Sequence, residues 1–200
     1  SEMGRMGLPV PPGFTISTKV CEIFYKDKKK LNSKLISQIK RELKVIEKDV
    51  SKKFGDLKNP LLLSVRSGAR VSMPGMMDTI LNLGLNDKTV VALAKKTSNG
   101  RFAKDSYRRF IQMYSNVVLG IENYYFEDLI ENYKLTKGVL LDTELDAEDW
   151  DGLIKDFKSI VKEKTKKDFP QDVYHQLIGA ISAVFLSWQS NRAKVYRKIN

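Results

Sequence analysis

Residues 61–78 have the sequence LLLSVRSGARVSMPGMMD. The first part, Leu61–Val65, is an apolar run bounded by turn-forming residues, and such a run predicts a buried β-strand. The second part holds small residues, glycine and proline, with two arginines before its first carboxylate, Asp78. A buried strand that runs directly into a loop of this composition predicts side chains held rigidly at the edge of a sheet.

Arg66 is the first residue after that predicted strand. Its guanidinium offers five donors in a planar fork, which suits bidentate contact with phosphate oxygens. Small residues beside it, such as Ser67 and Gly68, let backbone N–H groups approach a ligand closely. We therefore expect an anion-binding loop. The alternative is an ordinary arginine-rich loop paired to Asp78 or Asp87. It is not a Walker A loop, because GxxxxGK[ST] is absent.

The remainder of the chain favours helices, because apolar residues recur at steps of three and four. Residues 7–18 are an exception, since three prolines exclude a helix there. On the helix expected over residues 102–117, we predict an inner face made of Phe102, Ser106, Phe110, Met113 and Val117. The other expected helices cover residues 19–27, 33–50 with Ser33 as N-cap, 90–96, 126–133, a segment capped by Asp146, 173–188 capped by Asp172, and 192–198.

These elements predict a helix-rich α+β fold. Two hundred residues with 42% hydrophobic content suit one domain or two closely joined subdomains. The strand-bearing part occupies residues 1–86, and a helical part follows over residues 87–171. Residues 172–200 can pack back on the first part. We therefore expect one subdomain from residues 1–86 and 172–200, with the helical subdomain inserted between them.

The net charge of +11 admits nucleic acid, an anionic membrane surface or a phosphate-bearing small molecule as a partner. Most lysines lie in mixed runs, such as Lys26–Lys30 and Lys162–Lys167, which are typical of solvated surfaces. Nucleic acid is therefore not the expected partner. No apolar run approaches the ~20 residues that span a bilayer, so we expect no membrane partner either.

Three other features have ordinary structural interpretations. The single cysteine, Cys21, cannot form an internal disulfide and fits a reducing compartment. His175, the single histidine, has no Cys, Asp or Glu at the spacing of a zinc site, so we expect a surface or half-buried helical residue. Trp150, Trp188 and the Tyr124–Phe126 cluster stand at helical spacing, which favours core packing over base stacking.

Residues 64–87, SVRSGARVSMPGMMDTILNLGLND, closely resemble the signature stretch of the nucleotide-binding domain in the pyruvate, phosphate dikinase family. The likeness continues through GLPVPPGFTIST at 7–18, KKFGD at 52–56, RFAKDSYRRFIQMYSNVV at 101–118 and AVFLSWQSNRAKVYRK at 183–198. It covers nearly the whole chain. The related phosphoenolpyruvate synthases and glucan, water dikinases share only V-R-S followed by small residues.

The resemblance implies a partial ATP-grasp-like nucleotide-binding domain with an inserted helical subdomain. It also implies the overall reaction of the family, in which ATP, phosphate and pyruvate give AMP, pyrophosphate and phosphoenolpyruvate with Mg²⁺. Arg66 matches the arginine that binds the ATP phosphates. The residues that match the nucleotide loop of the family are Ser67, Gly68, Met73, Gly75 and Met77.

Other parts of the family's machinery lie outside the chain. The Gly-Gly-Lys-Gly segment of the family precedes the position of Ser1, and its acidic and glutamine Mg²⁺ ligands follow Asn200. The Thr-Ser-His segment that carries the phosphoryl group is also absent, and His175 does not match it. We therefore expect a partial ATP cleft without dikinase turnover, from a chain that is a piece of a longer protein.

The expected partners are ATP and the missing phosphohistidine and pyruvate-binding domains, and a homodimer of the complete enzyme is allowed. We expect a cytoplasmic location, and an organellar one stays open because any leader would lie upstream of Ser1. Two alternatives remain at this point. One is a non-enzymatic basic helical module that binds nucleic acid or acidic partners, and the other is a related dikinase with a different phosphate acceptor.

Overall fold

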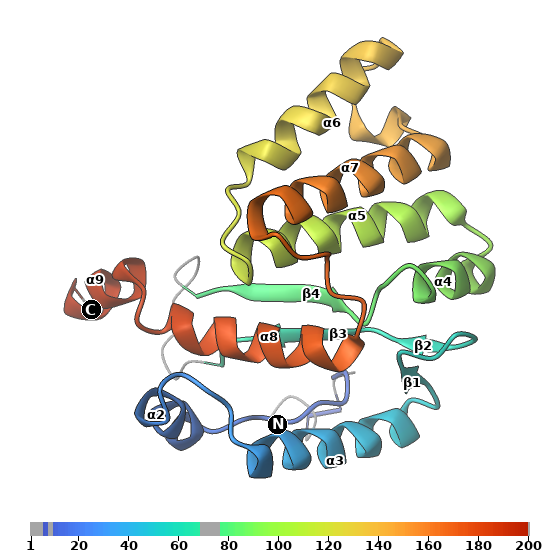
Figure 1. Ribbon diagram of the computed structural model, residues 1–200. Coiled ribbons are helices and arrows are strands. Elements are labelled where there is room, and N and C mark those ends of the chain that lie inside the picture. The colour runs from blue at the N-terminus through green and yellow to red at the C-terminus, as the bar shows by residue number, and fades with distance from the viewer. Residues whose placement is uncertain (1–5, 8–9, 69–76, 200) are drawn as a thin grey trace. The chain divides into compact units, whose positions relative to one another are not determined.

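The computed structural model describes residues 6–7, 10–68 and 77–199 (Figure 1). The chain divides into two compact units, Ser1–Lys53 and Phe54–Asn200. Helices dominate the described residues and the strands are short, which confirms the helix-rich α+β class. The division into an outer subdomain and an inserted helical one stays a prediction.

The first unit holds helices α2 (Thr18–Lys26) and α3 (Ser33–Asp49), and strand β1 (Lys53–Phe54) spans its boundary with the second unit. The N-cap of α3 is Asn32, whose side-chain oxygen accepts a hydrogen bond from the Leu35 N–H at 2.9 Å. The prediction of Ser33 as N-cap was therefore wrong by one residue. Asn32 keeps an extended backbone, as a capping residue does, whereas Ser33 is already helical. The buried residues of α3 are Ile39, Leu43 and Ile46, which recur at steps of four and three as an amphipathic helix requires.

The second unit is built around an antiparallel pair of strands, β3 (Leu63–Arg66) and β4 (Thr79–Leu83), and β2 (Pro60–Leu61) precedes it. The prediction of one buried strand over residues 61–65 was wrong, because the run is split between β2 and β3. Side chains of β3 alternate between half-buried and exposed. Helix α8 packs against both strands while α5 reaches β4, so β3 is covered mainly on one face.

Helix α5 is the centre of the helical part of this unit. It packs against α4, α7, β4 and α8, and α6 packs on α7. Figure 1 shows β4 between α5 on one side and α8 on the other, with α6 and α7 beyond α5. The helices are α4 (Thr89–Thr97), α5 (Gly100–Val117), α6 (Tyr124–Lys137), α7 (Ala147–Thr165), α8 (Val173–Ser187) and α9 (Asn191–Ile199), with a short 3₁₀ turn, η1 (Asp142–Glu144), before α7.

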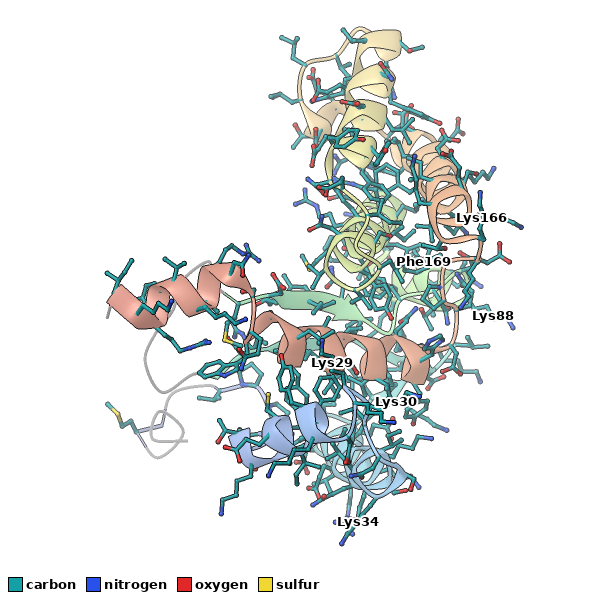
Figure 2. The ribbon with its side chains drawn as sticks, turned by 60° about the vertical axis from the view of Figure 1, so that its left-hand side comes forward. Lys29, Lys30, Lys34, Lys88, Lys166 and Phe169 are labelled. Atoms are coloured by element: carbon teal, nitrogen blue, oxygen red, sulfur yellow. The ribbon has the colours of Figure 1, made fainter. Side chains whose placement is uncertain are left out.

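The buried face of α5 differs from the predicted one. Phe102 is 50% exposed, so it does not belong to the inner face. The buried face is rotated by about one residue from the predicted one, and Phe110 belongs to both. Phe169 explains part of this rotation, since it turns inward (Figure 2) and makes edge-to-face contacts with three α5 rings. Those rings belong to Tyr107, Phe110 and Tyr114, and the other buried residues of α5 are Ala103, Arg108, Ile111 and Ser115.

Two helix starts that were predicted from sequence are confirmed. Asp146 caps α7, and its Oδ1 accepts hydrogen bonds from the Glu148 and Asp149 N–H groups at 2.8 and 3.1 Å. Asp172 caps α8 by accepting from the His175 N–H at 2.7 Å. Both caps are set by residues within one turn, which is why local sequence sufficed to predict them.

A buried glutamine ties the end of β4 to the start of α8. The Gln176 side chain is fully buried, and its Oε1 accepts from the Gly84 N–H at 3.2 Å. Its Nε2 donates to the carbonyl oxygens of Leu85 at 3.0 Å and Pro170 at 2.8 Å. Gly84 has φ +104°, and a Cβ there would lie 2.9 Å from the Leu61 carbonyl oxygen, so glycine is required.

The neighbouring residues strengthen the same junction. Asn86 Nδ2 donates to the Gln171 carbonyl oxygen at 2.9 Å, and the Asp87 N–H donates to Gln171 Oε1 at 2.9 Å. The Asp87 carboxylate accepts from the Tyr107 hydroxyl at 2.9 Å and from Lys158 Nζ at 2.7 Å. Residues 86–87 precede α4 and residue 171 precedes α8, so these hydrogen bonds join the two ends of the segment that contains α4 to α7.

We expect the substitution Gln176→Leu to lower the free energy of unfolding by about 3 kcal/mol, because it leaves one N–H and two carbonyl groups at the junction without their partner. Urea unfolding of the chain measures this. Gln189→Leu, at an exposed position near the end of α8, is the matched control and should change stability by less than about 0.5 kcal/mol. Equal effects of the two substitutions would contradict the role of the buried amide.

The cap of α7 also predicts a pH dependence. The hydrogen bond from Lys137 Nζ, 2.6 Å from Asp146 Oδ2, together with the backbone N–H groups of Asp149 and Glu148, lowers the pKa of Asp146 to about 2 from its ordinary value of 3.8. A depressed carboxylate pKa stabilises the fold above the unfolded value, and this contribution is lost as the pH falls towards the folded one. The difference in urea midpoint between the wild-type chain and Asp146→Asn should therefore be largest above pH ~5 and shrink towards pH ~2. A difference that stays constant over this range would rule out the charge of the cap as its source.

Candidate functional site

Arg66 is the last residue of β3, and its side chain is exposed. No ion pair or hydrogen bond joins its guanidinium to another residue of the described ranges. Asp78 and Asp87, the two carboxylates that could have paired with an ordinary arginine-rich loop, have other partners. Asp78 Oδ1 accepts from Arg192 Nη2 at 3.2 Å, and Asp87 is held by Lys158 and Tyr107. Among the described residues, Arg66 is thus a surface cation without an assigned structural partner.

The other predicted ligand-binding residues lie in the connection between β3 and β4. Ser67 is half-buried and Gly68 is exposed, directly after Arg66. Met77 is half-buried at the far end of the connection, next to Asp78, whose N–H donates to Ser187 Oγ on α8 at 3.4 Å. Because Arg66 pairs with Thr79, the two ends of the connection meet at one point. Met73 and Gly75 lie outside the described residues.

A hollow of about 520 Å³ lies where α5 crosses β4. Its lining combines apolar side chains with two arginines and several amides. Sequence reasoning missed this place, although the consecutive arginines at 108 and 109 were visible. Their position beside β4 follows from the packing of α5 and not from local sequence. The lining residues are Leu81, Asn82, Arg108, Arg109, Phe110, Gln112, Met113, Asn116, Val117 and Asn123.

Arg66 does not line this hollow, but its side chain lies on the same face of the β3–β4 pair as the side chain of Leu81, which does. Directly paired residues of antiparallel strands point their side chains to one face, so Arg66 and Thr79 share a face. Residues two apart in a strand also share a face, which adds Leu81. Leu81 lines the hollow. The opposite face carries the buried Ile80 and the half-buried Val65.

A second, smaller hollow of about 270 Å³ lies between the ends of α5 and α8. Small and apolar residues dominate it, including Gly179 and Ala183, and among the described residues Asp78 is the only ionisable one in its lining. This carboxylate is already engaged by Arg192. The larger hollow, with its arginines, is therefore the better candidate for a polar ligand.

Most of the charged surface is solvated, as predicted from the lysine runs. Figure 2 shows Lys34, Lys88 and Lys166 pointing away from the ribbon, and all three are exposed. His175 is exposed on α8, as expected. Cys21 is half-buried in α2, where burial and then the Glu22 charge raise the pKa of its thiol.

The aromatic residues divide between core and surface. Trp150 and Phe126 are fully buried, in agreement with the prediction of core packing. Tyr124 is 52% exposed and lies against Tyr125, so this part of the cluster was wrongly assigned to the core. Its position at the first turn of α6 leaves it beyond the helices that cover Phe126.

Within residues 6–7, 10–68 and 77–199, no group of three or more His, Cys, Asp or Glu side chains could hold a metal ion. Over the same part of the chain, none of the helices combines the length and the apolar character that a bilayer crossing needs.

Comparison with known proteins decides the family. Residues 28–200 match the family model described as pyruvate phosphate dikinase, AMP/ATP-binding domain. The chain belongs to this family. Pyruvate, phosphate dikinase from Clostridium symbiosum is 51% identical over 201 residues, which cover 100% of the chain and 23% of that protein. The membership agrees with the resemblance seen at residues 64–87, and no comparison supports a non-enzymatic basic module.

Two further relatives have the same relation to the chain. Pyruvate, phosphate dikinase from Entamoeba histolytica is 52% identical over 98% of the chain and 22% of its own length. The chloroplastic pyruvate, phosphate dikinase of Mesembryanthemum crystallinum is 52% identical over 100% of the chain and 21% of its length. The chain thus spans about a fifth of the length of the curated relatives that it matches.

The geometry of Arg66 predicts that this side chain is dispensable for folding. We expect Arg66→Ala to change the free energy of unfolding by less than about 0.5 kcal/mol, because the exposed guanidinium holds no partner among the described residues. Chemical denaturation followed by circular dichroism measures the change. A loss of about 2 kcal/mol or more would show that the guanidinium has a structural partner after all.

Proposed function

We propose that this chain is the ATP-binding portion of a pyruvate, phosphate dikinase, which converts ATP, phosphate and pyruvate to AMP, pyrophosphate and phosphoenolpyruvate. The observation that carries the proposal is the exposed Arg66 at the end of β3, within residues 64–87, whose sequence resembles the family. Family membership over residues 28–200 supports the nucleotide as ligand. The fragment alone is expected to be inactive in the overall reaction.

In this proposal Arg66 binds the phosphates of ATP. A guanidinium fixed at a strand end can contact two phosphate oxygens at once and stabilise the charge that develops on them during transfer. The backbone of Ser67 and Gly68 lies next to it, where small residues allow close approach to an anion. Met73, Gly75 and Met77 complete the nucleotide loop.

The hollow between α5 and β4 supplies further contacts for the same ligand. Its volume of about 520 Å³ lies in the range of small-molecule sites, and it shares the Arg66 face of the strand pair. Arg109 brings a second guanidinium, Asn116 an amide, and Met113 an apolar surface. We propose that ATP extends from the Arg66 end of this face towards the hollow.

The same proposal includes the fold, the subdomain division and the location that are expected from the sequence. They are an ATP-grasp-like fold, a helical subdomain over residues 87–171 inserted between residues 1–86 and 172–200, and cytoplasmic or organellar location. They also include Mg²⁺, whose ligands are expected outside the chain. The phosphohistidine and pyruvate-binding domains would be covalent partners in a complete enzyme, with a homodimer as its allowed assembly.

Isothermal titration calorimetry with ATP tests the proposal. We expect Arg66→Ala to weaken ATP binding by about 10- to 100-fold, because losing a charge-assisted contact costs about 1.5–3 kcal/mol. Arg41→Ala is the matched control, because Arg41 is also an exposed arginine but lies on α3. It should leave the affinity unchanged.

Equal ATP affinities of the wild-type chain and Arg66→Ala would overturn the proposal. A gel-shift assay at two salt concentrations examines the basic-module alternative in parallel. Tight nucleic-acid binding that falls steeply with salt, without any ATP binding, would favour that alternative.

A further inference from the structure

One carboxylate on α5 divides its two oxygens between consecutive arginines. Asp105 Oδ1 accepts from Arg108 Nη2 at 2.6 Å, and Asp105 Oδ2 accepts from Arg109 Nε at 3.0 Å. The spacings of three and four residues place all three side chains on neighbouring positions of the helix surface. Asp105 is only 18% exposed, so the carboxylate is largely shielded from water.

Arg108 is held firmly on the inner side of this group. It is 5% exposed, and its guanidinium lies over the Trp150 ring of α7, 4.5 Å from the ring centroid. Its Nη1 donates to Gln112 Oε1 at 3.2 Å. Burial lowers the pKa of Arg108, which nearby Asp105 partly opposes, and an arginine remains charged in either case. A rigid cation therefore fixes the orientation of the Asp105 carboxylate.

Arg109, unlike the buried Arg108, is exposed to solvent. Its side chain is 59% exposed and it lines the 520 Å³ hollow. Only Nε is engaged, and no described residue accepts from its two terminal nitrogens. The guanidinium is thus oriented through one edge, and the edge formed by the terminal nitrogens is left for another acceptor.

We propose that Asp105 and Arg108 are positioning residues that hold the Arg109 guanidinium in the orientation in which its terminal nitrogens meet the phosphate oxygens of ATP. The inference rests on the proposed function for its ligand. Without Asp105, a long exposed side chain would sample many rotamers and would have to be ordered when the ligand binds. Without Arg108, the carboxylate of Asp105 would be free to turn away from Arg109.

The order of the Arg109 side chain in the free chain tests the positioning directly. The NMR signals of arginine Nε–H groups give an order parameter for each guanidinium. We expect a high value for Arg109 in the wild-type chain and a clear loss in Asp105→Asn, which keeps the size of the side chain but removes its charge. The order of Arg66, on β3, should stay unchanged. An unchanged Arg109 order parameter in Asp105→Asn would overturn the proposal.

ATP titration then connects this order to binding. We expect Asp105→Asn to weaken ATP binding by about three- to tenfold, and to have no further effect in an Arg109→Gln background, because Asp105 acts through Arg109. A loss of the same size in both backgrounds would overturn the proposal. Asp105→Glu, which retains the carboxylate, should recover part of the affinity and part of the Arg109 order.

One further variant tests the role of the buried Arg108. Arg108→Met removes the inner cation and should lower the Arg109 order parameter as Asp105→Asn does. If this buried substitution prevents folding, Asp105→Asn and Asp105→Glu still test whether Asp105 positions Arg109. Loss of the proposed function would appear as ATP affinity that is insensitive to Arg66→Ala, whereas failure of the positioning would appear as Arg109 order and ATP affinity that are insensitive to Asp105→Asn.

Discussion

The buried side-chain amide of Gln176 is the interaction on which the second unit depends. Its oxygen and nitrogen satisfy backbone groups from two chain segments that are far apart in sequence, at Gly84, Leu85 and Pro170. Buried backbone groups without partners are costly, so this amide fixes where β4 ends and where α8 begins. Once these two ends are fixed, α8 is positioned along both β3 and β4.

The candidate site exists because helices cover the two faces of the β3–β4 pair to different extents. One face carries Ile80 in the core, while the other leaves Arg66 in solvent and is contacted by α5 at β4. A hollow forms where α5 leaves space beside Leu81. The outer surface of α5 brings Arg109 to this hollow, and the Asp105 carboxylate links Arg109 to the buried Arg108. Cations from two elements are thus presented to one side of the sheet.

Local features of this structure were predictable from the sequence, whereas features set by packing were not. The caps Asp146 and Asp172 act on N–H groups within their own helical turns, and both were predicted. The buried face of α5 depends on Phe169 and on α7, which come from distant segments, so Phe102 was misplaced. Arg66 could be singled out because a strand end and a family motif coincide there. The hollow could not, since it exists only where α5 crosses β4.

The hydrogen bonds that join residues 86–87 to residue 171 have a consequence for changes of length in the segment between them. A segment whose two ends lie side by side closes a loop on its own, and the entropy of closure rises only slowly with loop length. Lengthening a loop between helices α4 and α7 should therefore cost little closure entropy, while Gln176 and its hydrogen-bond partners stay in place.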